Sequence, residues 1–260
     1  MNLYVQQNQP PGVPPLELTG ERTLPDVPAE NYWYRRHLAV YKWIAARVAC
    51  GAVLDMACGE GYGSSVLARS AASVLGVDGN PEAHEHARLK YSRPGLSFAW
   101  GAVETFGSPG TFDAVVFLQT IEHVVDPVAV LTHFRSLLTP GGVAYVSTPN
   151  VLTLAPQGAA KSDNPWHLRE YRAEEFASLC RGVFSRVEML GLFHARKLRA
   201  HEVALKLGWD RVHKRLGVTR AFYDRFTPAI TSSDFALRPD RLAAALDFLA
   251  VCRCDCQNRE

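Results

Sequence analysis

The feature that most constrains the fold is a glycine-rich turn between an apolar segment and a helix-forming segment. Residues 52–57 read Ala-Val-Leu-Asp-Met-Ala, and the next six residues, Cys-Gly-Glu-Gly-Tyr-Gly, place glycines at 59, 61 and 63. Glycines let the backbone approach a ligand closely, and the first turn of the following helix offers unpaired amide groups. The pattern predicts a strand, a ligand-binding turn and a helix, which together open a nucleotide-binding α/β unit.

The segments that follow alternate in the way that such a fold requires. Strands are predicted at 73–78, 96–100, 112–118 and 143–148, and helices at 62–70, 82–91 and 128–138. Strands that alternate with helices of this length indicate βαβ units and a parallel sheet. Ligands of such sheets bind at the carboxyl ends of the strands.

The flanking regions have a different character. Six prolines within residues 1–30 predict an irregular arm, whose first dozen residues we expect to be disordered. Residues 31–260 are interpreted as one domain. Beyond the alternating core, a helix is predicted at 31–48, a loop at 150–172, a helix at 174–180, a strand at 186–193, charged helices from 196 to about 226–230, and a last strand at 246–252. The charged helices are expected to form either a lid over the acceptor or a contact of a homodimer.

Composition excludes several classes of protein. A net charge of +2 without a dense block of Lys and Arg argues against nucleic acid as a partner. No stretch approaches 18 apolar residues, and the N-terminus lacks a secretory pattern, so neither a membrane span nor export is expected. Six cysteines are too few for a disulfide scaffold, which favours a reduced, cytoplasmic protein. The C-x-C-x-C run at 252–256 has no partner ligands nearby and is interpreted as a final strand with a frayed tail, not as a zinc site.

The position of one acid helps to define the cofactor. The second predicted strand ends at Asp78, about twenty residues after Gly59, where an acid accepts hydrogen bonds from ribose hydroxyls. A dinucleotide-binding turn has the spacing G-x-G-x-x-G, which leaves room for a pyrophosphate. The glycines of this chain are spaced differently, and Asp55 lies just upstream of them.

The glycine turn, Asp78, the Phe-Asp-Ala-Val-Val strand at 112–116 and the Leu-Thr-Pro-Gly-Gly turn at 138–142 together resemble the motifs of class I S-adenosylmethionine (SAM)-dependent methyltransferases. The resemblance covers about residues 19–194 and implies a Rossmann-like, seven-stranded, mostly parallel sheet that binds SAM. It implies that the turn at Gly59 holds the methionine part of SAM, that Asp78 holds the ribose, and that Ala102 and Val103 flank the adenine. The full cofactor-binding set that it implies is Tyr32, Arg36, Asp55, Ala57, Gly59, Gly61, Asp78, Gly79, Ala102, Val103 and Gln119.

Two positions depart from the common pattern of that family. Ala57 replaces a frequent glycine, which is a mild change. Ala102 stands where many members carry an acid for the adenine amino group, so that hydrogen bond must come from another residue or be absent.

Candidate catalytic residues follow the fourth and fifth strands of the alternating core. Glu122 and His123 come shortly after strand 112–118, and His167 lies in the loop after strand 143–148, so all three should open onto one cleft. His123 is a candidate general base, since imidazole titrates near neutral pH. Alternatively Glu122, His123 and His167, with Gln119, hold Mg²⁺ or Mn²⁺, which would lower the pKa of an acceptor hydroxyl. A third interpretation is that Glu122 and His123 only cap the helix that begins near Pro127.

Two further resemblances bear on the methyl acceptor. The Ile-Glu-His sequence at 121–123, Ser-Thr-Pro-Asn at 147–150 and a later histidine are similar to small-RNA terminal 2′-O-methyltransferases. The metal site of that family uses two Glu and two His, and Gln119 replaces the first Glu here, which weakens charge neutralisation.

The segments 19–26, 30–37, 164–167 and 191–194 look like actinobacterial sugar O-methyltransferases. This resemblance implies a sugar or oligosaccharide hydroxyl as the acceptor, with Trp33 and Tyr34 suited to stacking on a sugar ring and Arg36 to pairing with the SAM carboxylate. The alternatives are methylation of an RNA terminal ribose, methylation of a small natural product, and a SAM-binding module without turnover.

Overall fold

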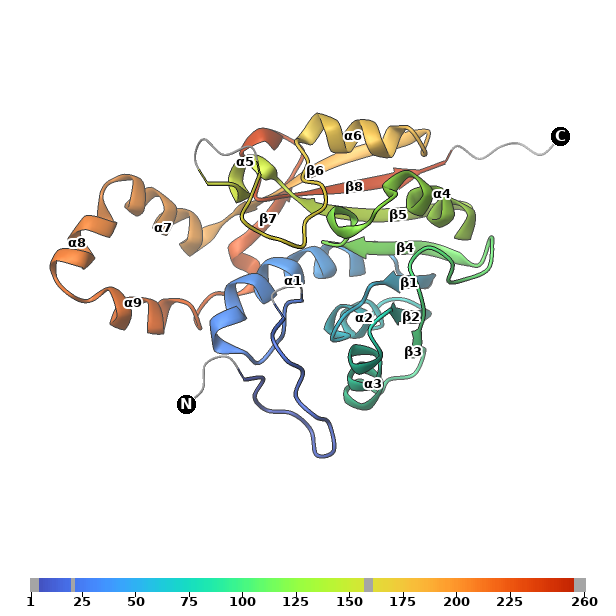
Figure 1. Ribbon diagram of the computed structural model, residues 1–260, viewed down its shortest axis with the longest axis horizontal. Helices are drawn as coiled ribbons and strands as arrows, with labels where there is room; N and C mark the ends of the chain where they lie inside the picture. The colour runs from blue at the N-terminus through green and yellow to red at the C-terminus, as the bar shows by residue number, and fades with distance from the viewer. Residues whose placement is uncertain (1–4, 20–21, 157–160, 255–260) are drawn as a thin grey trace.

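The computed structural model describes residues 5–19, 22–156 and 161–254. Figure 1 shows one twisted sheet with helices packed on both of its faces. The strands of the described chain are β1 (Ala52–Met56), β2 (Ser73–Asp78), β3 (Leu96–Trp100), β4 (Phe112–Leu118), β5 (Leu138–Pro149), β6 (Arg186–His194), β7 (Phe235–Arg238) and β8 (Asp247–Arg253). Their order across the sheet is β3-β2-β1-β4-β5-β8-β6-β7.

Neighbouring strands from β3 to β5 pair in parallel, whereas β8 pairs antiparallel with both β5 and β6. This arrangement confirms the predicted Rossmann-like fold with a mostly parallel sheet. The predicted number of seven strands was wrong for the described chain, because β7 adds an eighth. This strand has four residues and pairs only with the edge of β6, so its sequence carries no long alternating pattern.

The helices have largely the predicted positions. They are α1 (Asn31–Ala45), α2 (Tyr62–Leu67), α3 (Pro81–Lys90), α4 (Pro127–Leu137), α5 (Val151–Leu154), α6 (Ala173–Arg181), α7 (Arg196–Lys206), α8 (Trp209–Arg215) and α9 (Thr219–Phe226). Asn80 caps α3 and Asp126 caps α4, each by accepting a backbone N–H three residues ahead, with proline in the first helical turn.

The core has two layers because alternate residues of a strand face opposite sides of the sheet. Val53 of β1 packs with α1, whereas Leu54 packs with α4 and α6. The Leu-Thr-Pro-Gly-Gly segment, predicted as a turn, forms the first residues of β5, which begins directly after α4, and the pairing register between β4 and β5 shifts there. The side chains of both layers pack against the parallel strands, whose carboxyl ends all lie at the same edge of the sheet.

Among its described residues, the N-terminal arm has no helix or strand before a 3-10 turn at Pro28–Glu30. The expected disorder of its first dozen residues is wrong for residues 5–12. The Gln6 side chain is buried and donates a hydrogen bond to Glu60, inside the glycine-rich turn. Leu16, Leu24 and Val27 form a small apolar cluster of their own. The arm is therefore held against the cofactor turn by a buried polar contact that proline content does not reveal.

The charged region at 196–226 forms three helices, α7 to α9, which project from the end of the sheet near β7 (Figure 1). The Cys252 of the C-x-C-x-C run lies in β8, Cys254 follows it, and Cys256 lies outside the described residues. Among the described helices, we find none with the length and apolar character needed to cross a bilayer.

Candidate active site

The carboxyl ends of β1, β2 and β4 surround a cavity of about 300 Å³. Its lining includes five of the candidate residues named from the sequence: Ala57, Gly59, Asp78, Gln119 and His123. The walls also include His37 and Tyr41 of α1, and Arg22 and Thr23 of the N-terminal arm. The cavity therefore joins the predicted cofactor turn to one of the predicted acceptor residues.

The glycine turn shows why glycine occupies each position. Gly59 and Gly61 have left-handed φ angles of 58° and 93°. A Cβ at Gly61 would lie 2.8 Å from the Cβ of Ala87, whereas a Cβ at Gly59 would meet no atom within 4 Å. Gly61 is thus required by packing and by its backbone angle, and Gly59 leaves open space beside the cavity. Ala57 also has a positive φ of 56°, a left-handed conformation that favours the glycine which the family resemblance leads one to expect there.

Asp78 fixes the shape of this turn. One oxygen of its carboxylate accepts the Gly59 N–H at 2.8 Å, and the other accepts the Asn80 N–H at 2.8 Å. Because each carboxylate oxygen has two lone pairs, both can still accept a hydrogen bond donated by a ribose hydroxyl. Asp78 therefore organises the turn and lines the cavity with oxygens that can accept further hydrogen bonds.

Asp55 does not lie where it could contact a ligand in the cavity directly. Its side chain is fully buried beneath the turn and accepts hydrogen bonds from Tyr41 Oη at 3.2 Å and Ser64 Oγ at 2.6 Å. Burial raises its pKa to about 7. Asp55 does not line the cavity, so it supports the turn from below.

The structure separates two other predicted cofactor residues from the cavity. Arg36 is buried, and its guanidinium is engaged by both carboxylate oxygens of Asp247 at 2.6 and 2.5 Å and by the Leu246 carbonyl. The proposed pairing of Arg36 with the SAM carboxylate is therefore contradicted, because Asp247 already neutralises this charge. Tyr32 Oη bonds His194 Nε2 at 2.8 Å and lines a second cavity instead.

The predicted adenine side follows β2 and β3. Gly79 lies directly after Asp78, and its carbonyl accepts a hydrogen bond from Trp100 Nε1 at 2.9 Å. Ala102 and Val103 come two and three residues after β3 ends, within a turn closed by the Ala102 carbonyl. These three residues are outside the wall of the 300 Å³ cavity, and Ala102 offers only backbone groups to an adenine.

The acceptor candidates are held by the contact between two segments. A single 3-10 turn, η2 (Ile121–His123), follows β4, and its Glu122 carbonyl accepts the backbone N–H groups of Leu168 and Arg169. His123 Nδ1 donates to the Trp166 carbonyl at 2.9 Å, which leaves the lone pair of this imidazole on Nε2. These bonds fasten the loop at 161–172 to the turn after β4.

His167 is oriented within that loop. Its Nδ1 donates to a Glu170 oxygen at 2.8 Å, and its Nε2 accepts from the Asn164 amide at 3.0 Å. The rings of His123 and His167 meet edge to face with centroids 5.0 Å apart. The two predicted segments therefore come together as expected.

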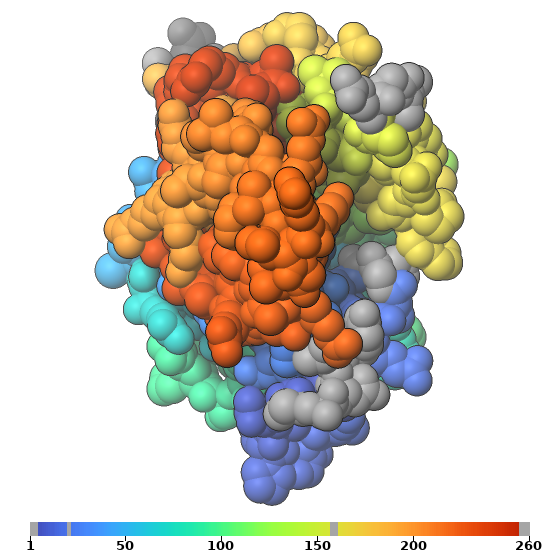
Figure 2. All heavy atoms as spheres, turned by 90° about the vertical axis from the view of Figure 1, so that its left-hand side faces the viewer, coloured from blue at the N-terminus to red at the C-terminus, as the bar shows by residue number. Residues whose placement is uncertain are grey.

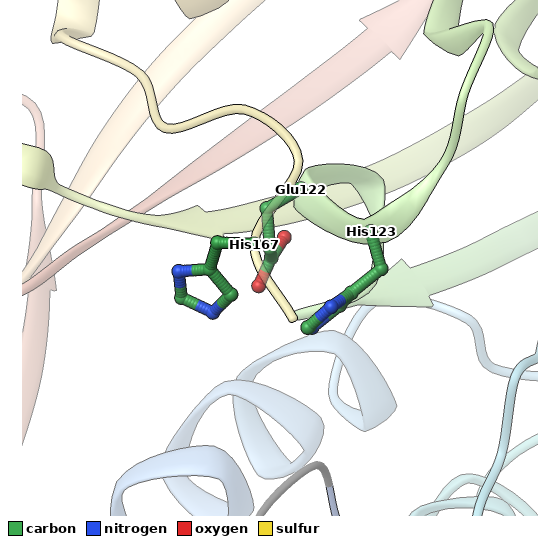
Figure 3. A group of neighbouring side chains, drawn as sticks. All are labelled: Glu122, His123 and His167. Atoms are coloured by element: carbon green, nitrogen blue, oxygen red, sulfur yellow. The ribbon is translucent and has the colours of Figure 1, made fainter. Parts of the chain in front are cut away.

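Glu122 completes a three-residue cluster. One ligand atom from each of Glu122, His123 and His167 lies within 4.8 Å of the others. Figure 3 shows the three side chains next to one another, Glu122 and His123 from the turn after β4 and His167 from the neighbouring loop. The Glu122 carboxyl is buried, accepts a hydrogen bond from Thr148 Oγ1 at 3.1 Å, and has its pKa raised to about 8 by burial. A cation would offset that burial and favour the carboxylate form. One carboxylate and two imidazoles fit a divalent ion such as Mn²⁺ better than Mg²⁺, which prefers oxygen ligands.

The side-chain amide of Gln119 donates to Ser147 Oγ at 3.0 Å, and the residue lines the 300 Å³ cavity together with His123. The interpretation of Glu122 and His123 as helix caps was wrong, because the cap of α4 is Asp126.

Three residues near the site were not among the candidates predicted from the sequence. His37 of α1 lines the cavity with a pKa lowered to about 4 by burial, so its imidazole is neutral at ordinary pH. Glu60 is buried in the turn and accepts hydrogen bonds from Lys90 and Tyr91 as well as Gln6. Its place between two glycines of the motif was the available signal. The sequence offers no comparable signal for Asp247, because its partner Arg36 is 211 residues away.

A family model described as a methyltransferase domain matches residues 32–203. The chain belongs to the class I SAM-dependent methyltransferases. The match spans the glycine turn, Asp78, Glu122 and His167, so SAM is the methyl donor of this methyltransferase.

Relatives of the methyltransferase agree with that assignment. A probable SAM-dependent methyltransferase of Mycobacterium tuberculosis (strain H37Rv) is 41% identical over 185 residues, covering 71% of this chain and 67% of the relative. A ubiquinone biosynthesis O-methyltransferase of Xanthomonas campestris is 41% identical over 127 residues, covering 45% of this chain and 53% of the relative. A Thermotoga maritima SAM-dependent methyltransferase superposes with a TM-score of 0.58 at 15% identity, covering 86% of this chain and 94% of that one, which shows the shared fold.

Proposed function

We propose that this methyltransferase transfers the methyl group of SAM to a hydroxyl of a sugar or oligosaccharide. The observation that carries the proposal is the position of His123, which lines the cavity of Gly59 and Asp78 and also belongs to the cluster with Glu122 and His167. A methyl donor bound at Gly59 and Asp78 would therefore share one cleft with a group able to take a hydroxyl proton. The Xanthomonas relative, named as an O-methyltransferase, agrees with oxygen as the accepting atom.

The proposed chemistry needs little beyond position and proton removal, because SAM is already an activated donor. The acceptor oxygen attacks the methyl carbon, and the carbon–sulfur bond breaks with its electron pair remaining on sulfur. The hydroxyl proton passes to His123 Nε2, whose lone pair is directed by the bond from Nδ1 to the Trp166 carbonyl. S-adenosylhomocysteine and a methyl ether are the products.

A divalent ion held by Glu122, His123 and His167 would polarise the acceptor hydroxyl and lower its pKa. The histidine and carboxylate donors of this chain would supply the ion with two nitrogens and one or two oxygens. Binding requires His167 Nε2 to exchange its Asn164 amide partner for the ion. His123 would then help to hold the ion, and bound water would be the remaining route for the proton.

A sugar acceptor is supported by the surroundings of this cluster. Trp166, whose carbonyl orients His123, has a half-exposed indole, and aromatic faces suit the apolar faces of sugar rings. Arg22 and Thr23, from the arm segment that resembles sugar O-methyltransferases, line the cavity.

The test is incubation of the protein with methyl-labelled SAM and a panel of mono- and disaccharides, with and without EDTA. A short RNA with free terminal ribose hydroxyls and a set of phenolic natural products complete the panel. We expect label to enter at least one carbohydrate as a methyl ether. Label in the RNA or the phenols alone would replace the sugar proposal, and SAM binding without transfer to any acceptor would favour a binding module.

A further inference from the structure

Helices α7 and α9 line a second cavity, of about 260 Å³ and open to solvent, that the proposed reaction does not use. It lies where α7 and α9 meet the N-terminal turn of α1 and the end of β6. Leu198, Leu205, Phe226 and Ile230 supply apolar walls, and Tyr32 and Tyr223 add aromatic ones. The cavity is therefore built mainly by the helices that follow the sheet core.

The polar atoms around this cavity are satisfied by one another. Tyr32 Oη bonds His194 Nε2 at 2.8 Å, and His194 Nδ1 faces a Glu202 oxygen at 3.4 Å. On the other side, His201 Nε2 bonds Tyr223 Oη at 3.2 Å. A ligand group that enters would meet mostly carbon surface, and a polar group would have to displace one of these bonds.

The cavity lies along the same edge of the sheet as the methyl-transfer site. Glu122 bonds Thr148 of β5, Thr148 is paired with Phe248 of β8, and Phe248 is paired with Gly191 of β6. Two inter-strand steps of about 4.8 Å separate β5 from β6, and His194, the β6 residue that lines the cavity, lies three residues beyond Gly191, so Thr148 and His194 are roughly 14 Å apart. Figure 2 shows a recess between the orange α7–α9 helices and the yellow loop at 161–172.

We propose that this cavity receives an apolar portion of the methyl acceptor, an alkyl, acyl or phenyl group attached to the sugar. This inference rests on the proposed sugar methylation for the identity of the acceptor. A cavity of roughly 150 Å³ holds a benzene ring, so 260 Å³ accommodates a group of up to about ten carbon atoms. The separation of the two sites is spanned by one or two sugar rings, which places a hydroxyl at His123 while the apolar group fills the cavity.

The binding test uses 1-octanol, which carries the apolar chain without a sugar. Titration calorimetry should detect saturable octanol binding to the wild type. Leu205→Trp places a larger side chain at the cavity wall and should weaken octanol binding at least tenfold. Leu207→Trp makes the same change two residues away, at a side chain that is 83% exposed and outside the cavity, and should bind octanol like the wild type. SAM binding by all three proteins establishes that they are folded.

The activity test compares methyl and octyl glycosides of the sugar that accepts label, below the micelle concentration of the octyl compound. Each buried methylene favours binding, so KM for the octyl glycoside should be at least tenfold lower in the wild type and in Leu207→Trp. That advantage should be lost in Leu205→Trp. Absent octanol binding, or binding and KM ratios unchanged by Leu205→Trp, overturns the proposal. If no sugar is methylated but octanol still binds and Leu205→Trp blocks it, the cavity stands and the sugar acceptor fails.

Discussion

The two halves of the carboxyl edge are built in different ways. At β1 and β2, the proposed cofactor side is made by residues 57–60 and by Asp78, which lie close together in the sequence. At β4 and β5, the acceptor side is made by side chains from η2 and from the loop at 161–172, which meet through hydrogen bonds over more than 40 residues. The cofactor side is thus local in sequence, and the acceptor side depends on long-range packing.

Each half contains a buried carboxyl group whose pKa is raised by burial, Asp55 in one and Glu122 in the other, and these two groups differ in their partners. Asp55 lies beneath the glycine turn with two hydroxyl donors, Tyr41 and Ser64, and contacts no cavity. Glu122 has the hydroxyl of Thr148 and two neighbouring imidazoles that can serve a common ligand. Burial raises the pKa of both carboxyls, to about 7 and about 8. A raised pKa alone therefore does not distinguish a supporting carboxyl group from a reactive one. The side chains that surround the carboxyl group make that distinction.

The largest expected effect separates the two halves directly. His123→Ala should lower turnover by about 10²–10⁴-fold, the range for loss of a general base, while the dissociation constant for SAM stays within about threefold. The measurements are steady-state turnover with the best acceptor of the panel and calorimetry with SAM. His84→Ala on α3 is the matched control and should change neither. Retained turnover in His123→Ala would remove this residue from the mechanism.

Metal removal should also affect the acceptor side only, by lowering turnover. EDTA should lower turnover at least about tenfold and Mn²⁺ should restore it, because the ion would serve the acceptor hydroxyl and not SAM, which has no phosphate. Glu122→Gln should have low turnover that neither EDTA nor Mn²⁺ changes. Full activity of the wild type in EDTA would leave His123 acting as a base without an ion.

On the cofactor side, Asp78→Asn should weaken SAM binding by about 10–100-fold. One of the two backbone amides, of Gly59 or Asn80, would then face an NH₂ group in place of a carboxylate oxygen, and hydrogen bonds to charged groups are worth about 1.5–3 kcal/mol. Turnover at saturating SAM should change much less. Glu174→Gln removes an exposed carboxylate on α6 and should leave SAM affinity unchanged. Equal SAM affinity in wild type and Asp78→Asn would place the ribose elsewhere.

The same contrast explains what the sequence could predict. The turn at 57–63 and the acid at 78 were predictable because backbone conformation and spacing define them locally. The meeting of Glu122, His123 and His167 followed from parallel topology, which brings strand ends to one edge. Asp247 lies at that edge too, but it comes from an antiparallel strand late in the chain. Its pairing with Arg36 therefore could not be predicted from the spacing of residues in the sequence. The strand β7 escaped notice for a related reason, since four residues at the sheet edge need no alternating pattern.

The smallest expected effect tests the supporting role of Asp55. Its folded pKa of about 7 exceeds the ordinary value of 3.8, so the folded protein holds a proton on Asp55 that the unfolded chain has lost between those two pH values. The stability contributed by the neutral form is fully present below about pH 4 and is lost as the pH rises through 7. Asp55→Asn cannot ionise, so the melting temperature of the wild type should fall by several degrees relative to this variant between pH 5 and pH 8, both without SAM. A difference between the two proteins that stays constant over this interval would mean that Asp55 is charged in the folded state throughout, and that the hydroxyls of Tyr41 and Ser64 outweigh its burial.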